Sequence, residues 1–292
     1  MSDPVEPARA PASLLVEALP YIRRWWGQTV VVKYGGSALA GTDGADPLTS
    51  FASDVVLLRT VGIRPVVVHG GGPQIGELMA RLGKVPEFRD GLRVTDAETL
   101  DIARMVLVGK VNRDIVSAIN AHGPLAVGLS GEDAGFITAG AAHPDLGYVG
   151  EVRSVDTDLV QRLLTEELIP VVATIGSDGH GQSYNINADT AAAAVAAALG
   201  AAKLVYLTDV AGVRARRDDP ASLVRSAAPE ELEALVASGA VGDGMIPKVL
   251  GCVEAVRGGV CRAHILDGRR AHALLVELFT DDGVGTMVEA AS

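Results

Sequence analysis

Apolar runs alternate with helically spaced stretches along most of the chain. Six runs rich in apolar and β-branched residues predict buried strands, at Gln28–Tyr34, Arg64–Val68, Leu125–Leu129, Ile169–Ile175, Lys203–Leu207 and Ala263–Asp267. Apolar positions three and four apart predict helices at Leu48–Val61, Pro73–Leu82, Thr95–Ala121, Asp156–Glu167, Ala188–Leu199, Ala228–Ser238 and Lys248–Gly258. Phe136–Val152 is richer in turn-forming residues and predicts hairpins. This alternation indicates an α/β fold, with an open, mainly parallel central sheet sandwiched between helices.

A separate helix is predicted before the first strand, from about Ser13 to Trp26. One of its faces is apolar and contains Leu15, Leu19, Ile22 and Trp26. Pro20 lies inside this helix and predicts a kink or break there. An apolar helix outside the main fold usually packs on its own domain, and the alternative is packing on another subunit. Periodicity alone leaves both arrangements open.

Two glycine-rich corners follow early strands, at Lys33–Gly36 and His69–Pro73. In an open α/β sheet, ligands bind where strands end and helices begin, because glycine lets ligand oxygens approach backbone N–H groups. The competing explanation is that glycine merely permits a tight turn, but two corners on neighbouring strands favour anion binding. Lys33 lies near the end of a strand that should be buried, so it either reaches the surface or neutralises phosphate charge.

Further polar residues could serve the same site. Asn185, Asn187 and Asp189 alternate in an extended segment, which places them on one side of it. Helix capping explains any single one of them, but three in register exceed what one cap needs. Lys248 follows a loop with glycine and proline, and Asp189 could orient both Lys248 and Lys33 through charge-assisted hydrogen bonds.

Two loops carry residues suited to ligands. The guanidinium of Arg93 suits a two-point grip on a carboxylate, and surface placement is the alternative. Thr208 and Asp209 follow a predicted strand and could hold a nucleotide or its metal, with a simple turn as the competing explanation.

The composition narrows the class of protein. The 292 residues suffice for two packed domains, and the formal net charge of -11 argues against nucleic acid and anionic membranes as partners. Two cysteines, no signal core and no apolar stretch of about 18 residues together predict a reducing, cytoplasmic location. Walker A and G-x-G-x-x-G loops are absent, and no cluster has metal-ligand spacing, so no metal held by the protein alone is expected.

These parts suit phosphoryl transfer to a carboxylate. Such a reaction depends on positioning and charge neutralisation more than on covalent chemistry. A carboxylate is already ionised at neutral pH, so no general base is needed, but two anionic reactants repel each other. Two ammonium groups and backbone N–H groups would offset that repulsion.

Six motifs, in order, resemble those of the amino acid kinase family. They are Val32–Gly36 (VKYGG), Val68–Pro73 (VHGGGP), Asp90–Thr95 (DGLRVT), Tyr184–Asp189 (YNINAD), Leu207–Val210 (LTDV) and Gly244–Lys248 (GMIPK). Each motif is modest alone, whereas the ordered set, spanning about Gln28 to Val288, is specific. The chain resembles in particular those members that use ATP to phosphorylate the γ-carboxylate of N-acetyl-L-glutamate in arginine biosynthesis.

The resemblance implies a role for each residue. Lys33 and Lys248 would be catalytic, organised by Asp189. The substrate-binding residues would be Gly71, Gly72, Arg93, Asn185 and Asn187, and the nucleotide-binding residues Gly35, Gly36, Thr208, Asp209 and Met245. ATP would come with Mg²⁺ held by its phosphates. Residues 28–200 would form the acetylglutamate-binding domain and residues 201–292 the ATP-binding domain, after an N-terminal arm and kinked oligomerisation helix at residues 1–27.

Two features resemble the longer, arginine-inhibited members of the family, which are hexamers. One is the helix with Pro20 before the first strand, and the other is a C-terminal His…Glu…Gly-x-Gly-Thr pattern. This likeness implies a trimer of dimers joined through the N-terminal helix, and feedback inhibition by arginine. The arginine site would comprise Tyr21, Lys203, His272, Glu277, Gly283 and Gly285, with Glu277 pairing with the guanidinium.

Two other functions stay open on these grounds. One is a sibling kinase acting on aspartate, glutamate, carbamate, uridylate or a carrier-bound aminoadipate. The other is a non-catalytic arginine sensor on the same fold, against which the presence of Lys33, Asp189 and Lys248 argues.

Overall fold

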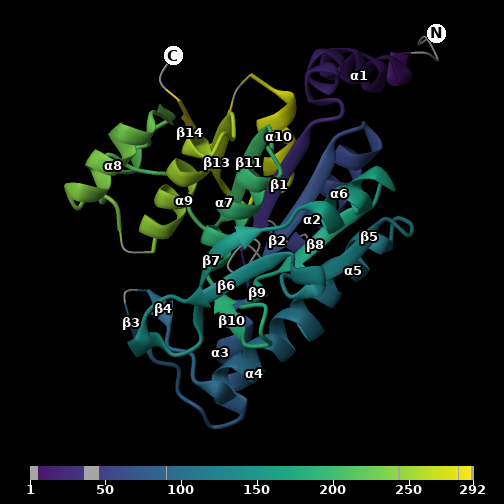
Figure 1. Cartoon of the computed structure of the whole chain (residues 1–292). Coiled ribbons are helices and arrows are strands. Elements are labelled where there is room, and N and C mark those ends of the chain that lie inside the picture. The colour runs from purple at the N-terminus through teal and green to yellow at the C-terminus, as the bar shows by residue number, and fades with distance from the viewer. Residues whose placement is uncertain (1–5, 36–45, 90, 243, 282, 291–292) are drawn as a thin grey trace.

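The structure is a computed structural model that describes residues 6–35, 46–89, 91–242, 244–281 and 283–290, with side chains from Ser13 onward. Its centre is an eight-stranded sheet (Figure 1). In spatial order the strands are β12 (Ser226–Ala227), β14 (Thr286–Glu289), β13 (Arg262–Asp267), β11 (Lys203–Thr208), β1 (Thr29–Tyr34), β2 (Arg64–His69), β8 (Ile169–Ala173) and β5 (Ala126–Ser130). β14 runs antiparallel to β13, and the other neighbouring pairs in this sheet are parallel. The predicted strands and the mainly parallel sheet are confirmed.

β1 lies in the middle of the sheet and positions Lys33. It pairs with β11 on one side and β2 on the other, so Lys33 is opposite Tyr206 and Val68 in the register. Side chains alternate along β1, so Val31 belongs to the core on one face and Val32 to the core on the other. By the same alternation, Lys33 points to the face of Val31.

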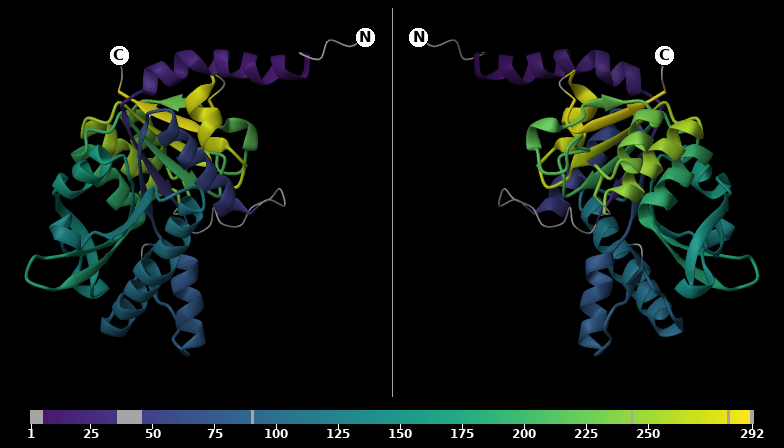
Figure 2. Two further views of the ribbon diagram at one scale, coloured as in Figure 1. Left: turned by 90° about the vertical axis from the view of Figure 1, so that its right-hand side faces the viewer. Right: turned by 90° about the vertical axis from the view of Figure 1, so that its left-hand side faces the viewer.

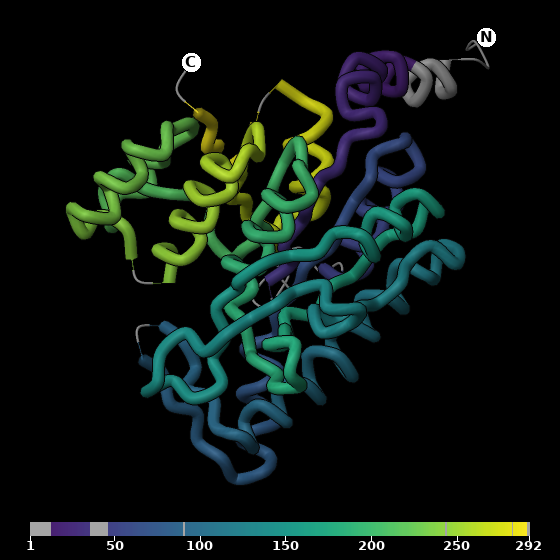
Figure 3. Tube along the Cα trace, viewed as in Figure 1, coloured from purple at the N-terminus to yellow at the C-terminus, as the bar shows by residue number. Residues whose placement is uncertain are grey.

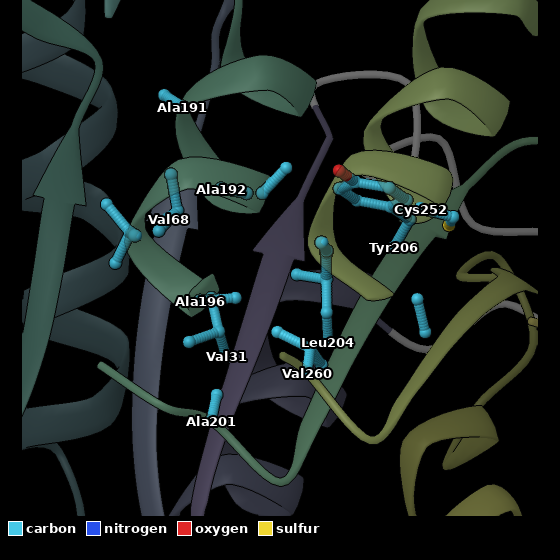
Figure 4. Close-up of a cluster of buried hydrophobic side chains, with 14 of the residues drawn as sticks. Val31, Val68, Ala191, Ala192, Ala196, Ala201, Leu204, Tyr206, Cys252 and Val260 are labelled. Carbon is cyan, nitrogen blue, oxygen red and sulfur yellow. The ribbon is translucent and has the colours of Figure 1, made fainter. Parts of the chain in front are cut away.

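Helices cover both faces of the sheet. The face of Val31 shares a core with α6 (Asp158–Thr165), α7 (Ala188–Ala198), α8 (Pro229–Ala237) and α9 (Ile246–Arg257). The opposite face shares a core with α2 (Pro47–Thr60), α3 (Gly72–Arg81), α4 (Ala97–Arg104), α5 (Asn112–Asn120) and α10 (Ala273–Phe279). Figure 4 shows Ala192 and Ala196 of α7 beside Val31 and Val68. Small alanine side chains let α7 approach the sheet closely.

Smaller β structures lie outside the main sheet. β6 (Ile137–Ala141), β7 (Val149–Val155), β9 (Ile175–Ser177) and β10 (Ser183–Ile186) form a closed barrel, and β3 (Phe88–Arg89) forms a hairpin with β4 (Leu92–Arg93). Single 3-10 turns occupy Asp133–Gly135, Pro144–Leu146 and Pro220–Ser222. The antiparallel pair of β6 and β7 confirms the hairpin predicted within Phe136–Val152.

The long helix predicted at Thr95–Ala121 is present but not uniform. α4 leads through a π-helical segment, Met105–Val111, into α5. π-helical segments are rare and occur frequently at functional sites. This one is followed directly by Asn112, whose side chain is completely buried.

The N-terminal helix differs from its prediction. α1 (Glu6–Trp25) begins earlier than expected and continues through Pro20, so the proline does not break it. Figure 2 shows α1 lying across one end of the molecule. None of the helices in the described part of the chain combines the length and apolar character that crossing a bilayer requires.

α1 docks on the rest of the chain through its last turn. Trp25 is buried, and its Nε1 donates a hydrogen bond of 3.0 Å to the carbonyl of Leu278 on α10. Leu15 and Leu19 remain 70% and 42% exposed. Only the last turn of this helix therefore packs on its own domain here, and packing of the exposed part on another subunit stays a prediction.

The boundary predicted between residues 200 and 201 falls within a continuous sheet. β11 follows that boundary in sequence, yet it pairs directly with β1. The two predicted lobes therefore share one sheet, and their division stays a prediction.

α1 and the end of β14 lie at the same end of the molecule (Figure 3).

Candidate active site

The carboxyl ends of β11, β1 and β2 lie side by side because the three strands are parallel neighbours. Ligands bind at such edges in open α/β sheets. Lys33 is the penultimate residue of β1 and is only 6% exposed. Its side chain points toward α7 and α9, which carry Asp189 and Lys248. Three segments far apart in sequence thus converge at this edge.

Asp189 contacts both lysines. Its Oδ1 lies 2.8 Å from the Lys33 Nζ, and its Oδ2 accepts a hydrogen bond of 3.0 Å from the Lys248 Nζ. Lys248 also donates to the carbonyl of Gly244 at 3.3 Å. The three residues predicted to be catalytic are therefore assembled, with two ammonium groups facing one carboxylate.

This trio carries an excess positive charge. Burial alone would raise the pKa of Asp189, but the two ammonium groups outweigh burial and hold that pKa below its ordinary value. The carboxylate therefore stays ionised at neutral pH. One carboxylate between two ammonium groups leaves a positive balance in a poorly hydrated place, which favours an anionic ligand.

A cavity of about 210 Å³ opens beside Lys33 and Asp189, on the side of β2. Its lining includes all the residues predicted to bind substrate, namely Gly71, Gly72, Arg93, Asn185 and Asn187. Gly71 is required for space, because a Cβ there would lie 2.8 Å from the Leu107 side chain. α3 begins at Gly72, so the cavity lies at a helix N-terminus, where unpaired backbone N–H groups favour anions.

Two polar side chains of this cavity are held in place by their neighbours. Arg93 donates a hydrogen bond of 2.9 Å to the carbonyl of Gly72 and lies 4.7 Å from the ring centroid of Phe88. Asn185 donates to the Thr95 hydroxyl at 3.4 Å. These contacts fix the side chains at the cavity wall before any ligand binds.

Asn187 combines capping with its place in the cavity lining. Its Oδ1 accepts hydrogen bonds from the backbone N–H groups of Asp189 and Thr190, at 2.8 and 3.2 Å. Capping, the alternative considered for these residues, therefore holds for Asn187, and it also fixes the first turn that carries Asp189.

A buried histidine lies behind the second glycine corner. The His69 ring is completely buried, its Nδ1 lies 3.0 Å from the Gly70 carbonyl, and its Nε2 lies 3.1 Å from the Asn112 Nδ2. Asn112 also donates to the carbonyl of Val171 at 2.8 Å. Burial lowers the pKa of His69 to about 4, so the ring is neutral, donating from Nδ1 and accepting at Nε2. This network links the corner to α5 and β8.

The residues predicted to bind the nucleotide lie on the other side of Lys33. Thr208 ends β11, and its hydroxyl donates to the Asp209 carboxylate at 3.1 Å. Gly35 directly follows β1, and Met245 directly precedes α9. Gly36 lies outside the described residues. β1 therefore lies between Thr208, at the end of β11, and the strand β2 that leads into the cavity.

No dedicated metal cage is found in the residues that the structure describes, where no three His, Cys, Asp or Glu side chains are grouped to bind one ion. Both oxygens of Asp189 face lysines.

A second, larger cavity of about 690 Å³ lies at the opposite end of the strands, by the amino ends of β11 and β13. Its lining includes Tyr21, Lys203, Glu277, Gly283 and Gly285, five of the six residues predicted to bind arginine. Glu277 Oε1 lies 3.0 Å from the Lys203 Nζ and 2.8 Å from the His264 Nδ1. The Lys203 Nζ also lies 5.0 Å from the ring centroid of Trp25.

This second cluster is balanced in charge. Burial would raise the pKa of Glu277, but His264 and Lys203 hold it below its ordinary value. Burial lowers the pKa of His264, so its ring is neutral at neutral pH. One ammonium group and one carboxylate therefore face each other here.

His272 is the exception among the predicted arginine-site residues, because it does not line this cavity. Its Nδ1 lies 2.6 Å from the Asp54 Oδ1 on α2. Glu277 is five positions after His272, so the helical turn directs the two side chains differently. Burial raises the pKa of Asp54 to about 6, and the contact with His272 opposes that rise.

Some residues at the site were not singled out from the sequence. Leu107, Phe88 and Val149 line the smaller cavity. Apolar residues around a ligand have no sequence signal that separates them from ordinary core. Tyr206 on β11, by contrast, has a signal in the sequence, because a hydroxyl in a strand predicted to be buried needs a hydrogen-bond partner.

Comparisons with known proteins agree with this geometry. The model of the amino acid kinase family matches residues 28–267. An acetylglutamate kinase of Symbiobacterium thermophilum is 54% identical over 287 residues, covering 95% of this chain and 97% of that protein. Two structures of N-acetylglutamate synthase from Neisseria gonorrhoeae, complexed with coenzyme A and either N-acetyl-glutamate or L-arginine, are 32% identical, with TM-scores of 0.84 and 0.82 over 96% of this chain.

The synthase is a longer protein, since this chain spans only 64% and 66% of the two synthase chains. The kinase relative, by contrast, is matched over nearly its whole length. With a family model that covers most of the chain and a relative at 54% identity, the chain belongs to the amino acid kinase family.

Proposed function

We propose that this chain transfers the γ-phosphoryl group of ATP to the γ-carboxylate of N-acetyl-L-glutamate, as a cytoplasmic enzyme of arginine biosynthesis. The observation that carries the proposal is the pairing of Asp189 with Lys33 at 2.8 Å and with Lys248 at 3.0 Å, beside a glycine-lined cavity. The printed name of the kinase relative supports this acceptor.

The proposed reaction is an in-line displacement. A carboxylate oxygen of the acceptor attacks the γ-phosphorus, the bond to the β–γ bridging oxygen breaks, and ADP leaves with N-acetylglutamyl 5-phosphate as the other product. Lys33 and Lys248 neutralise the charge of the transferring group, and Asp189 holds the two ammonium groups in position. The acceptor is already ionised, so no side chain has to remove a proton.

Each substrate approaches Lys33 from its own side. N-acetyl-L-glutamate occupies the cavity by β2, where the Arg93 guanidinium and the N-terminus of α3 attract its carboxylates. ATP occupies the side of β11, near Gly35, Gly36, Thr208, Asp209 and Met245. Mg²⁺, when bound, neutralises the phosphates on which it arrives. Apart from Gly35 and Gly36, residues 28–200 would serve the acceptor and residues 201–292 the nucleotide.

Release of ADP measures this function directly. Turnover of N-acetyl-L-glutamate should exceed turnover of glutamate and aspartate by about a hundredfold or more, because an unpaired ammonium group is costly to bury in the cavity. Equal rates with the acetylated and free amino acids would favour a sibling kinase. Arginine binding without any turnover would favour a sensor.

We propose further that arginine inhibits the enzyme from the 690 Å³ cavity. Glu277 is placed to pair with a guanidinium, and the L-arginine complex of the structurally similar synthase supports such a ligand on this fold. His272 is not part of this proposal. Rates measured with and without arginine test it in the same assay.

We also propose that α1 joins subunits into a hexamer, a trimer of dimers. Leu14, Leu15 and Val16 are 65%, 70% and 70% exposed, which is unusual for three consecutive apolar residues. Leu15→Glu should lower the molar mass measured by light scattering, because it places a charge in the proposed contact. Glu17→Gln, at an exposed position of the same helix, is the matched control. An unchanged mass in both variants would contradict the role of this face.

A further inference from the structure

Tyr206 stands out among the buried residues near the trio. It lies in the middle of β11, its side chain is completely buried, and it is the register partner of Lys33 on β1. Tyr206 and Lys33 share the face of the sheet that α7 and α9 cover. Its neighbours along β11, Leu204, Val205 and Leu207, are apolar, so the Tyr206 hydroxyl is the one polar side-chain group in the middle of this strand.

The hydroxyl reaches the residue that orients both lysines. Tyr206 Oη donates a hydrogen bond of 2.7 Å to the backbone carbonyl of Asp189. The backbone N–H of Asp189 is held by Asn187 at 2.8 Å. Both polar backbone groups of Asp189 therefore have side-chain partners, while its carboxylate remains directed at Lys33 and Lys248.

The same hydroxyl also contacts α9, the helix that carries Lys248. A Cβ built on Gly251 would lie 2.4 Å from the Tyr206 Oη, 3.4 Å from its Cζ and 3.4 Å from the Asp189 carbonyl oxygen. Only glycine therefore leaves room for the hydroxyl between the first turn of α7 and α9. Gly251 lies three residues after Lys248, nearly one turn along the helix. Figure 4 shows the Tyr206 ring next to Cys252 of α9.

We propose that Tyr206 is a positioning residue for phosphoryl transfer, which sets the distances among Lys33, Asp189 and Lys248 through its hydroxyl and the space at Gly251. This inference rests on the proposed function. One side chain touches all three elements of the trio: it neighbours Lys33 across the strands, bonds to Asp189, and fits against the helix of Lys248. Burial raises the pKa of Tyr206 well above its ordinary value, so the hydroxyl stays a donor at every working pH.

A purely structural role makes a different prediction. If the ring served only as core, Tyr206→Phe would keep the packing and leave turnover unchanged. If the hydroxyl positions Asp189, the same variant lowers kcat about tenfold and leaves both KM values within about twofold, because one net hydrogen bond is lost at the reacting centre and none at the binding walls.

Tyr34→Phe is the matched control. Tyr34 is the residue after Lys33 on the same strand, and among the described residues its buried hydroxyl has no hydrogen-bond partner. Its ring stacks on Phe51, on the opposite face of the sheet, with centroids 4.1 Å apart. Removing this hydroxyl should leave kcat within about twofold and should not lower the melting temperature.

A double-mutant cycle at Tyr206 and Gly251 separates space from positioning. Gly251→Ala alone should lower both the melting temperature and kcat, because its methyl group collides with the hydroxyl. In Tyr206→Phe/Gly251→Ala the methyl group occupies the vacated space, so the melting temperature should recover while kcat stays at the level of Tyr206→Phe. Full recovery of kcat in the double variant, or normal kcat in folded Tyr206→Phe, overturns the inference.

Failure of the positioning role of Tyr206 can be distinguished from failure of the proposed function. If the wild-type chain releases no ADP with N-acetyl-L-glutamate and ATP, the proposed function fails. If the wild-type chain turns over and Tyr206→Phe matches it, only the positioning role of Tyr206 fails.

Discussion

Two buried clusters of lysine and carboxylate lie at opposite ends of the parallel strands of one sheet. Lys33 lies near the carboxyl end of β1 and Lys203 at the amino end of β11, and they are 6% and 3% exposed. At the first end, one carboxylate faces two ammonium groups. At the second, Glu277 faces one ammonium group and a neutral histidine. A surplus of positive charge at the first cluster suits an anionic ligand. At the second, the Lys203 ammonium and the Glu277 carboxylate balance each other, within a cavity that is also lined by arginines.

The largest effect should come from removing one cation at the first end. Lys33→Ala should lower kcat by about a hundredfold to a thousandfold, because the charge on the transferring phosphoryl group loses one of its two ammonium partners. The chain should stay folded, since Asp189 keeps Lys248. Coupled ADP release measures kcat, and circular dichroism confirms folding.

Lys203→Met provides the comparison at the second end. It removes a lysine that is equally buried, but kcat should fall less than tenfold, because this lysine lies at the other end of the strands. Comparable losses of kcat in both variants would show that the two ends do not differ in the proposed way.

The next effect concerns the response to arginine. Glu277→Gln keeps the size of the side chain and removes the carboxylate that faces Lys203 at 3.0 Å. The arginine concentration for half inhibition should rise at least about 30-fold, the cost of losing one partner of a buried charge pair. Inhibition curves with arginine at fixed substrate concentrations measure this. An unchanged curve would place arginine elsewhere.

The smallest effect concerns the stability contributed by the buried His69 at the first end of the sheet. His69 has its pKa lowered from 6.5 to about 4, so the unfolded chain takes up a proton first as the pH falls. The contribution of His69 to stability is therefore complete above pH 6.5 and declines as the pH falls toward 4. Between about pH 7.5 and 5 the advantage of the wild type over His69→Gln should shrink by about 2 kcal/mol.

Urea denaturation at several pH values measures this difference in unfolding free energy. His180→Gln, at an exposed position, is the matched control for the substitution itself. A parallel shift for His69→Gln at every pH would mean that His69 is not held neutral by the fold.

The sequence predicted the two ends unequally. Lys33, Asp189 and Lys248 were predictable as a set because glycine corners and alternating polar residues mark the ends of strands. Two elements around the second cavity, β14 and α10, were missed because both are short, and α10 has only seven residues. Leu15 and Leu19 obey helical periodicity, but periodicity does not say whether a face packs within one chain or between chains.

Residues whose role depends on close packing in three dimensions also could not be predicted from the sequence. Gly251 looks like any glycine in a helix, and only the approach of Tyr206 reveals why it has no side chain. Resemblance assigned His272 to the arginine site, whereas in the structure its Nδ1 faces Asp54, a contact that the sequence does not indicate.

β11 connects the cavity proposed for arginine with the end of the sheet proposed for the two substrates. The strand is six residues long, begins with Lys203 and ends with Thr208, so about 17 Å of extended backbone spans the two. Ladders with β1 and β13 hold it on both sides. An extended chain has almost no slack, so a ligand that draws the first residue along the strand axis carries the last by nearly the same distance. If arginine binds beside Lys203 as proposed, a shift of that residue along the strand would therefore be felt at Thr208.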